Sequence, residues 1–308
     1  MRSIIKKITP AVFRYYYQQT KQLIYKIKGV KRKRRLITYL QSKNNLPLEE
    51  SELLHNLLKS NKITVFPYDY VEKYHWQDIK MEYDKKEKMY YTLLFGDKRL
   101  YFKQKMTKRS CAEYISSIAC EQDLQSPHCY LSDTFTVGDS AALVDAGAAE
   151  GYFALSVIDK AQKIYLFEPD SEWRKALEAT FRPWREKVEI VPKFVDVRDN
   201  ETSVSLDAFF ENRTYPTFIK ADIEGFEKNL LLGAKNILTT ASSLSIAICA
   251  YHRQNDYEDL SKILSGYNFS LAPSHGFMFL YTDGTFPYLR RGILRAQKDL
   301  YNEEIKNK

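Results

Sequence analysis

Two glycines and a downstream acid in the middle of the chain have the spacing of a nucleoside-binding site. The segment Asp145-Ala-Gly-Ala-Ala-Glu-Gly151 follows an apolar stretch and precedes an amphipathic one. Gly147 and Gly151 would let the backbone turn tightly and approach a ligand beside the N-terminus of the next helix. Glu168 ends the following apolar stretch, where its carboxylate can accept hydrogen bonds from both ribose hydroxyls. Together these features predict a nucleoside ligand.

The glycine spacing disfavours two common kinds of nucleotide site. It is DxGxxxG rather than GxGxxG, and no Lys-Ser or Lys-Thr pair follows it as in a P-loop. A nicotinamide-dependent oxidoreductase is therefore disfavoured. Asp196 comes at the end of the third apolar stretch, where a carboxylate can reach the exocyclic amine of adenine. An exposed loop acid is an equal alternative for this residue.

A lysine and three carboxylates surround the end of the fourth apolar stretch, in the segment Lys220-Ala-Asp-Ile-Glu-Gly-Phe-Glu227. Ligands of open α/β sheets bind at the carboxyl ends of the strands, so Asp222 and Glu224 are candidates for contact with the reacting groups. In a purely structural interpretation, Lys220 pairs with Asp222, and the two glutamates favour the first turn of a helix. The position of the segment favours the functional interpretation.

From Ala141 onward, apolar stretches alternate with amphipathic ones. The predicted strands are 142–146, 164–167, 188–195, 218–223 and 244–250, and the predicted helices are 152–160, 171–184, 226–238 and 257–264. Such alternation predicts an α/β fold with a mostly parallel, doubly wound sheet and helices on both faces. Residues 269–273 and 277–281 flank Ser274-His-Gly276, which predicts a closing antiparallel hairpin.

The part of the chain before this domain has a mixed pattern. A helix is expected over 49–59, a β-hairpin from 90–95 and 99–102, and a further helix over 110–121. We therefore expect four parts: a basic amphipathic arm (1–48), a small α+β subdomain (49–137), the α/β domain (138–290) and a charged C-terminal tail (291–308).

The positive charge of the chain belongs to the arm. Its 48 residues contain thirteen Lys or Arg and no acid, whereas the chain as a whole carries a net charge of +8. Apolar residues recur at roughly helical spacing from Ile5 to Ile27, and Pro10 should interrupt the helix. Residues 1–35, with the run Lys31–Arg35, could contact anionic lipid or nucleic-acid phosphates, or stay solvated or packed internally. Nucleic acid is the least favoured, because no base-reading module accompanies the arm.

Length and composition bound the remaining possibilities. The 308 residues, 44% of them hydrophobic, can bury one large core or two modest ones. We find no apolar run long enough to span a membrane and no signal peptide, and expect a cytoplasmic protein, either free or peripheral at the inner membrane face. The four cysteines have neither CxxC nor zinc-ligand spacing, which predicts free thiols and no structural metal.

Four segments together resemble FkbM-type methyltransferases, which use S-adenosylmethionine. They are Val144–Gly151, Leu166–Asp170, Ser205–Asp207 and Lys220–Glu227. The last keeps each fixed position of the KxDxEGxE signature that separates this family from other class I methyltransferases. Ala250-Tyr-His252 and Ser126-Pro-His128 are further similar pieces. The resemblance covers about 140–285 and implies the Rossmann-like, seven-stranded, mostly parallel sheet of class I methyltransferases, consistent with the terminal hairpin.

The resemblance also implies roles for individual residues. Asp145, Gly147 and Gly151 would surround the methionine and ribose end of the cofactor, Glu168 would hold the ribose diol, Asp196 the adenine, and Asp222 would face the site of methyl transfer. Asp222, Glu224 and His252 are the candidates for the base that removes the acceptor proton. The strand-end carboxylates and the histidine could instead hold a divalent metal. His128 and His275 are expected to be structural.

The acceptor is expected to be a hydroxyl of a saccharide, glycolipid or related metabolite, because FkbM-type enzymes as a group O-methylate such compounds. The chain also lacks the Pro-Pro motif typical of enzymes that methylate amino groups of adenine or glutamine. Two alternatives stay open. One is a fold that binds the nucleoside without turnover and acts as a scaffold at the membrane surface, and the other is an RNA methyltransferase that binds phosphates through the arm.

Overall fold

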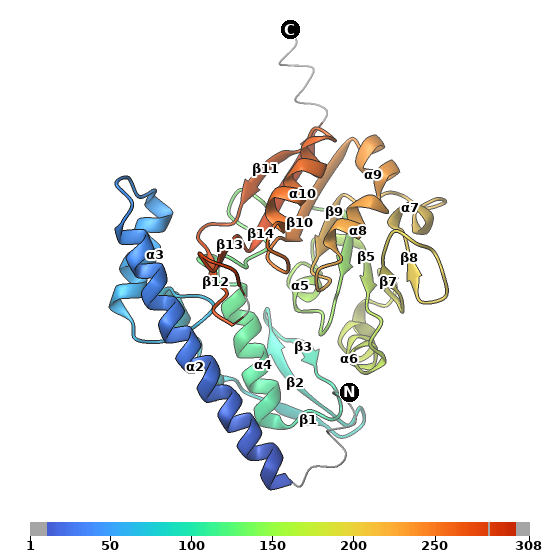
Figure 1. Cartoon of the computed structure of the whole chain (residues 1–308). Helices are drawn as coiled ribbons and strands as arrows, with labels where there is room; N and C mark the ends of the chain where they lie inside the picture. Colours follow the sequence, from blue (N-terminus) through green and yellow to red (C-terminus); the bar gives the residue numbers. More distant parts are fainter. Residues whose placement is uncertain (1–10, 283, 300–308) are drawn as a thin grey trace. The chain divides into compact units, whose positions relative to one another are not determined.

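A computed structural model describes residues 11–282 and 284–299 of the chain (Figure 1). Its contacts divide the chain into two compact units. The first unit, which we call the helical unit, comprises the residues up to 69 together with 276–290. The second, which we call the sheet unit, comprises 70–275 and the residues from 291 onward. No helix in the described part of the chain is both long enough and apolar enough to cross a membrane.

The described helices are of very different lengths. They are α2 (Ala11–Gln41), α3 (Leu48–Lys59), α4 (Lys108–Glu121), α5 (Tyr152–Ser156), α6 (Ser171–Phe181), α7 (Leu206–Phe209), α8 (Glu227–Leu232), α9 (Lys235–Thr240) and α10 (Asp256–Ser265). Short 3-10 helices cover Asp69–Lys73, Trp76–Asp78 and Arg182–Trp184.

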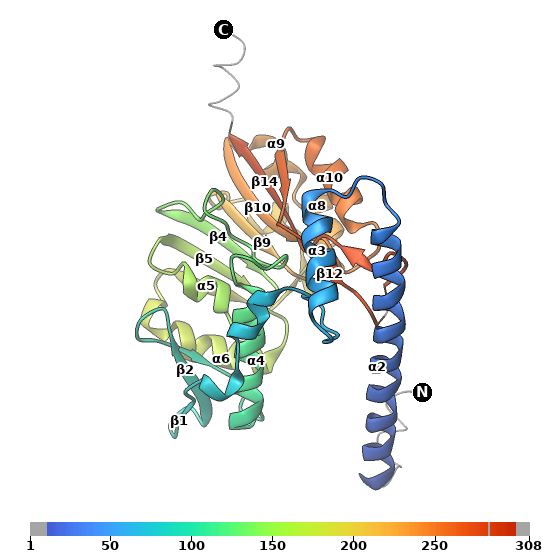
Figure 2. The same cartoon turned by 90° about the vertical axis from the view of Figure 1, so that its left-hand side faces the viewer.

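Seven strands form the main sheet, in the order β11-β14-β10-β9-β4-β5-β6 (Figure 2). They are β4 (Ala141–Ala146), β5 (Ala161–Phe167), β6 (Val188–Val191), β9 (Phe218–Ala221), β10 (Ser243–Cys249), β11 (Ser270–Pro273) and β14 (Ile293–Asp299). Neighbouring strands are parallel except at β14, which runs antiparallel to both β10 and β11. The fold is therefore an α/β fold with a mixed, mostly parallel sheet of seven strands, as the sequence predicts.

Three smaller sheets accompany the main one. The first joins β1 (Glu82–Asp84), β2 (Met89–Leu94) and β3 (Lys98–Tyr101), the second joins β7 (Phe194–Val195) and β8 (Ser203–Val204), and the third joins β12 (Met278–Phe279) and β13 (Leu289–Arg290). The antiparallel pairing of β2 with β3 confirms the predicted hairpin.

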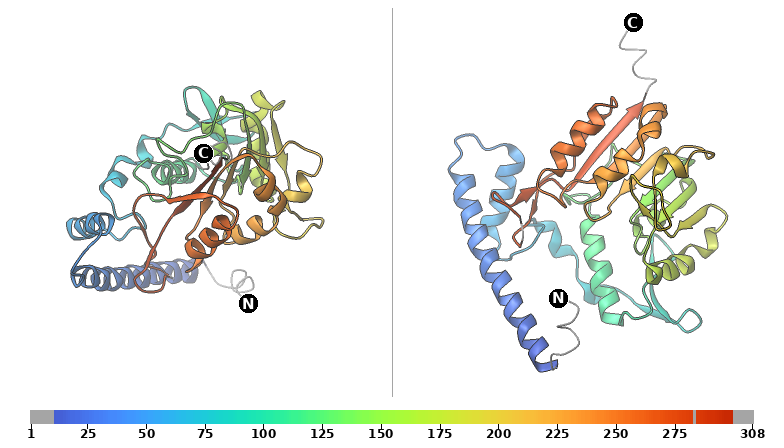
Figure 3. Two further views of the ribbon diagram at one scale, coloured as in Figure 1. Left: turned by 90° about the horizontal axis from the view of Figure 1, so that it is seen from above. Right: turned by 45° about the vertical axis from the view of Figure 1, so that its right-hand side comes forward.

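The main sheet is buried on both faces, with helices on either side (Figure 3). Successive residues of a strand point to opposite faces. Leu143 and Phe218 belong to one core with residues of α4, α5 and α6, whereas Val144 and Ile219 belong to another with residues of α8, α9 and α10. Asp145 and Lys220 follow at the same period of two, so both side chains point to the α4 side of the sheet. The charged centre of the site is fixed by this alternation.

The predicted closing hairpin is wrong in its second strand. β11 pairs with β14, not with residues 277–281, and the chain between them belongs to the helical unit. There the amides of Phe277 and Phe279 donate to the Tyr68 hydroxyl and the Val65 carbonyl. The apolar run at 277–281 therefore stabilises a different core from the one its spacing suggested.

Part of the predicted charged tail is an interior strand of the main sheet, next to the edge strand β11. Residues 293–299 form β14, whose Ile293, Leu294 and Ala296 are buried. The charges that suggested an exposed tail are used internally: Arg295 donates to the carbonyls of Cys129, Tyr130 and Leu131, and Lys298 donates to those of Leu238 and Thr239. The charged composition suggested an exposed tail, but Arg295 and Lys298 can lie in a strand because they donate hydrogen bonds to buried carbonyl groups.

Two predicted elements are interrupted where the backbone chemistry requires it. The strand expected over 188–195 ends at Val191, because Pro192 has no amide hydrogen, and Phe194–Val195 pairs with β8 instead. The helix expected over 226–238 is split at Gly233, where a Cβ atom would lie 2.6 Å from the carbonyl oxygen of Asp196. Asp196 directly follows β7, and its carbonyl oxygen lies against Gly233, so both interruptions occur beside this residue.

The basic run Lys31–Arg35 is partly used inside the helical unit. Arg32 donates to the carbonyl of Tyr281, Arg35 donates to the Tyr288 hydroxyl, and Lys33 donates to backbone carbonyls at 60 and 62. Internal packing therefore accounts for three of these five cations. The first ten residues, with Ile5, Ile8 and Pro10, lie outside the described residues, and membrane contact through residues 1–35 stays a prediction.

Gly151 should be more sensitive to substitution than an open glycine. Its φ is +86°, and a Cβ atom there would lie 2.6 Å from Cε2 of Phe181 and 2.8 Å from Cδ2 of Leu177. We expect Gly151→Ala to lower the free energy of unfolding by about 1–3 kcal/mol in urea titrations, because overpacking adds to backbone strain. Gly138→Ala, where nothing lies within 4 Å, is the control and should change it by less than about 0.5 kcal/mol. Equal effects would contradict the packing explanation.

Candidate functional site

An ion pair buried between two central strands forms the floor of the site. Asp145 on β4 and Lys220 on β9 are directly opposite each other in the strand register. Lys220 Nζ lies 3.0 Å from Asp145 Oδ1, and the two side chains are 5% and 1% exposed. Lys220 also donates to the carbonyl oxygen of Gly147 at 2.7 Å. One cation therefore fixes both the strand-end acid and the first turn of the glycine loop.

Lys220 remains charged in this position. Burial lowers the pKa of Lys220, but the charges of Asp145 and Asp222 outweigh burial and raise it above its ordinary value. The sequence also allowed an ion pair between Lys220 and Asp222. In the structure, Lys220 contacts Asp145, and Asp222 is near enough only for its charge to affect the pKa of Lys220.

Asp222 lies at the centre of the site, just after β9. Its Oδ2 accepts a hydrogen bond of 2.9 Å from the Tyr130 hydroxyl, and its Oδ1 lies 3.6 Å from Nε2 of His252. Burial alone would raise the pKa of Asp222, but the charges of Lys220 and His252 help to hold it below its ordinary value. Asp222 is therefore an ionised, hydrogen-bonded carboxylate at neutral pH.

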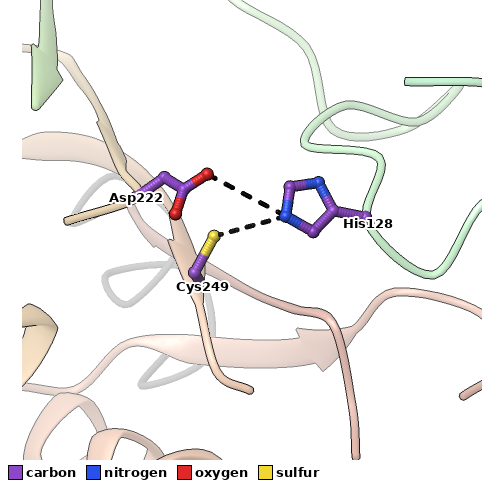
Figure 4. Close-up of side chains that lie close together, drawn as sticks. All are labelled: His128, Asp222 and Cys249. Atoms are coloured by element: carbon purple, nitrogen blue, oxygen red, sulfur yellow. Dashed lines mark hydrogen bonds and ion pairs between the residues drawn. The ribbon is translucent and has the colours of Figure 1, made fainter. Parts of the chain in front are cut away.

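His128 lies close to both Asp222 and Cys249 (Figure 4). Its Nε2 lies 3.9 Å from Asp222 Oδ2, 3.8 Å from Cys249 Sγ and 3.2 Å from the Tyr251 hydroxyl. The ring is only 3% exposed, and burial lowers the pKa of His128 to about 4. His128 is thus a neutral hydrogen-bonding residue at neutral pH, which agrees with the structural role expected from the sequence.

His252 bridges two carboxylates. Its Nδ1 lies 3.0 Å from Oε1 of Glu227, a side chain that is only 1% exposed, while Nε2 faces Asp222. Burial lowers the pKa of His252, but the contact with Glu227 and the charges of Asp222 and Glu224 raise it overall. His252 is not among the residues that line the two cavities described below.

Glu224 occupies a strained but open position. Its φ is +56°, and its side chain is 93% exposed. Gly225 follows with φ +91°, so the chain makes two consecutive left-handed steps between β9 and α8. The turn brings Glu227 back to bind the amide of Ile223 at the N-terminus of α8.

A cavity of about 300 Å³, which we call the acidic cavity, opens above the ion pair. It is lined by Tyr114, Ile118, Glu121, Gln122, Tyr130, Asp145, Gly147, Ala148, Ala149, Glu150, Tyr152, Phe153, Lys220, Asp222, Glu224 and Tyr251. Five of these side chains are carboxylic acids and one is a cation, so the cavity has an excess of negative charge. Its aromatic residues make much of the remaining wall.

A second cavity of about 640 Å³, which we call the larger cavity, shares four lining residues with the first, namely Gly147, Ala149, Asp222 and Glu224. Its other lining residues are Phe167, Glu168, Pro169, Asp170, Trp173, Lys193, Phe194, Val195, Asp196, Asn200, Thr202, Ser203, Ile223 and Phe226. The two cavities therefore adjoin along the glycine loop and the residues after β9.

Backbone amides hold Glu168 in the larger cavity. The amide of Ala149 donates to its Oε2 at 2.8 Å, and the amide of Asp170 donates to its Oε1 at 2.7 Å. Each carboxylate oxygen keeps a second lone pair, so the group can still accept hydrogen bonds from a vicinal diol. Asp196 lies in the same cavity, where its Oδ1 accepts from the Asn229 side chain and the Val197 amide, both at 2.7 Å.

The two glycines of the motif have different roles. Gly147 lines both cavities, and a Cβ atom there would lie 1.9 Å from the carbonyl oxygen of Asp222. Gly151 lines neither cavity and instead packs against Phe181 and Leu177 of α6. The structure thus places Gly147 in the lining of both cavities and Gly151 at a helix contact, where the sequence predicted both beside the cofactor.

Among the residues that the structure describes, two groups of donor atoms lie close enough together to hold a metal ion: His128, Asp222 and Cys249, and Asp222, Glu227 and His252. Burial keeps the pKa of Cys249 well above its ordinary value, so its sulfur is a thiol. The raised pKa of His252 likewise favours a protonated ring. Metal binding at either group would therefore release a proton.

Several residues of the site carry no signal in the sequence. Glu121 and Tyr114 come from α4, which precedes the glycine motif along the chain, and Tyr130 comes from the following loop. The similar pieces that end at His128 and His252 point to this region without singling out Tyr130 or Tyr251. Only the packing of α4 on the Asp145 face of the sheet brings these residues into the cavity.

Comparison with known proteins identifies the relatives of the chain. The family model of the methyltransferase FkbM domain matches residues 99–281, more than half of the chain. A search of curated protein sequences found no match.

Solved structures give more distant likenesses. A methyltransferase FkbM from Methylobacillus flagellatus is 17% identical with a TM-score of 0.45, and the match covers 82% of this chain but 63% of that one. A precorrin-6y C5,15-methyltransferase from Geobacter metallireducens is 9% identical, with a TM-score of 0.37 and coverages of 64% and 91%. An rRNA methylase from Streptococcus thermophilus is 14% identical, with a TM-score of 0.36 and coverages of 53% and 89%. At these scores the likenesses carry no argument about the site.

Removal of the buried cation should lower the stability of the sheet unit. Lys220→Met leaves Asp145 as an uncompensated buried carboxylate, so we expect a loss of about 3–5 kcal/mol in the free energy of unfolding, measured in urea. The double variant Lys220→Met with Asp145→Leu should recover most of this loss, since it removes both charges. A double variant as unstable as the single one would contradict the assignment of the pair.

The pH dependence of stability should carry a contribution from His128. The unfolded chain binds a proton at His128 below about pH 6.5, whereas the folded chain does so only below about pH 4. The contribution of His128 to the free energy of unfolding therefore falls as the pH decreases from about 6.5 to about 4. The difference should reach on the order of 3 kcal/mol. Unfolding of His128→Gln should lose this contribution, whereas His75→Gln, an exposed histidine, should keep it. Comparison of variants is needed because the raised pKa of Glu121 acts in the opposite direction.

Proposed function

The chain belongs to the FkbM methyltransferase family, and we propose that it transfers a methyl group from S-adenosylmethionine to a hydroxyl of a saccharide, glycolipid or related metabolite. The observation that carries the proposal is the position of Glu168. Its carboxylate is held by two backbone amides in a cavity that adjoins the strand ends, with further lone pairs available for a ribose diol.

The larger cavity suits the adenosine part of S-adenosylmethionine. Phe167, Trp173, Phe194 and Phe226 supply apolar wall, and Asp196 supplies an acceptor for an exocyclic amine. Asn229 and the Val197 amide fix the orientation of that carboxylate. The absence of a side chain at Gly147 lets the backbone pass close to the carbonyl of Asp222 where the two cavities meet.

The acidic cavity suits the reacting end. S-adenosylmethionine supplies, when bound, a methyl group on a positively charged sulfur. The carboxylates of the cavity produce a negative potential that favours a cation there, and Lys220 keeps Asp145 and the Gly147 carbonyl in place. Asp222 stays ionised beside this position because its pKa is held low. The chain's own residues thus bind and orient the reacting groups, which supplies much of the rate of such a transfer.

The lining of the acidic cavity also bears on the acceptor. Aromatic rings and carboxylates suit a neutral or cationic compound that carries hydroxyl groups, such as a sugar or an amino sugar. An acceptor with a phosphate or carboxylate next to its reacting hydroxyl would be repelled by the acidic side chains. We therefore propose a neutral or cationic saccharide unit at the reacting position.

Binding of the cofactor product provides a test that needs no acceptor. S-adenosylhomocysteine at 100 times its dissociation constant should stabilise the native chain by about 2.7 kcal/mol in thermal unfolding, and NAD should not. Glu168→Gln should weaken the binding measured by calorimetry at least about tenfold, because an amide cannot accept from both backbone amides and a diol. Glu178→Gln, an exposed position on α6, is the matched control and should bind as the wild type does.

Two results would count against this function. No stabilisation at millimolar S-adenosylmethionine or S-adenosylhomocysteine would contradict the cofactor assignment. Binding without methyl transfer to a panel of methyl glycosides and amino sugars, with RNA methylated instead, would contradict the acceptor class and favour the RNA alternative.

A further inference from the structure

The three groups that the sequence offers as bases have other tasks in the structure. Asp222 is hydrogen-bonded by Tyr130 and its pKa is low, so it is a poor proton acceptor. The side chain of Glu224 is 93% exposed. His252 is held between Asp222 and Glu227, and it lines neither cavity. None of the three is both enclosed by the acidic cavity and free of strong partners, so another wall of that cavity is the better source of a base for a hydroxyl acceptor.

Glu121 lines the acidic cavity from the wall formed by α4. It is the last residue of this helix, and its side chain is 27% exposed. Its contacts are weak: the Ser117 hydroxyl donates to Oε1 at 3.4 Å, and Nδ1 of His128 lies 3.9 Å from Oε2. Because His128 is neutral at pH 7, this neighbour adds no cation to stabilise the carboxylate. Glu121 is thus held in the cavity without the strong partners that occupy Asp222.

The surroundings of Glu121 disfavour its charge. Burial, followed by the charges of Asp222 and Glu150, raises the pKa of Glu121 to about 7. Glu150 lies in the glycine loop, where it accepts a hydrogen bond from the Tyr114 hydroxyl. The charge of Glu121 in turn helps to raise the pKa of Tyr251, which follows β10. The negative end of the α4 dipole acts in the same direction. A group with this property is suited to proton transfer near neutral pH.

We propose that Glu121 is the general base of the methyl transfer proposed above, acting from the cavity wall to which α4 contributes. A lone pair of the acceptor oxygen forms the new bond to the methyl carbon, and the electron pair of the broken carbon–sulfur bond remains on sulfur. The hydroxyl proton passes to the Glu121 carboxylate and is later released to water. The inference rests on the proposed function, and it assigns to α4 a catalytic residue rather than a merely structural one.

The protonation of Glu121 can be measured without an acceptor. Carbon-13 NMR of the full chain, labelled at the glutamate carboxyl groups, should show one group that titrates between pH 6 and 8 with S-adenosylhomocysteine bound. This signal should be absent in Glu121→Gln and present in Glu113→Gln, an exposed glutamate on the same helix. A Glu121 carboxyl that titrates below pH 5 would overturn the assignment. Glu121→Asp provides a second variant in case the amide impairs folding.

Cofactor binding and turnover separate catalysis from other roles. Glu121→Gln should bind S-adenosylhomocysteine within about twofold of the wild type. Its kcat on a methyl glycoside that the wild type methylates should fall by about 10²–10⁴-fold, with loss of the acidic limb of the pH profile. Loss of S-adenosylhomocysteine binding in this variant would show that Glu121 holds the cofactor, and an unchanged pH profile would show that another group is the base.

These measurements distinguish failure of the inference from failure of the proposed function. If the wild-type chain binds neither S-adenosylmethionine nor S-adenosylhomocysteine, both are overturned. If the wild type binds and transfers methyl groups while Glu121→Gln keeps its rate and pH profile, the base assignment alone is overturned. Glu113→Gln should match the wild type in each assay, since it lies on the exposed side of α4.

Discussion

The ion pair between Asp145 and Lys220 is the constraint on which the rest of the site depends. The two residues are opposite each other on neighbouring parallel strands, almost fully buried, and point to the same face of the sheet. A buried lysine needs its carboxylate and the carbonyl of Gly147, because an uncompensated charge in the interior is very costly. The same contacts define where the glycine loop turns and where Asp222 leaves the sheet. Both cavities are built on this junction.

Around the pair, similar carboxylates acquire different properties from their neighbours. Asp222 has a tyrosine donor and a nearby lysine, and its pKa is low. Glu168 is fixed by backbone amides and faces the larger cavity. Glu121 has only weak contacts at a helix C-terminus among other acids, and its pKa is raised. Burial and neighbouring charges thus divide binding, orientation and proton transfer among residues of the same chemical type.

Charged residues outside the two cavities illustrate how composition alone can mislead. Lys33, Arg295 and Lys298 come from segments that look like a basic arm and a charged tail, yet each donates to backbone carbonyls within its own unit. In both cases a long side chain buries its stem and satisfies polar backbone at its end. The same composition would suit an exposed surface, so it does not distinguish the two outcomes. Hydrogen-bond partners remote in the chain decide between them.

Between Ala141 and Leu264 the sequence by itself determined the alternation of the main strands with helices, the glycine loop and the acids that follow the strands, because these depend on local periodicity and backbone chemistry. It therefore predicted Asp145, Glu168, Asp196 and Asp222 at the strand ends, and a family that the match over 99–281 confirms. Only the tertiary structure decided that β14 completes the sheet, that Gly151 serves helix packing, and that α4 brings Glu121 to Asp222. Those outcomes depend on contacts between residues far apart in the chain, and no local pattern encodes them.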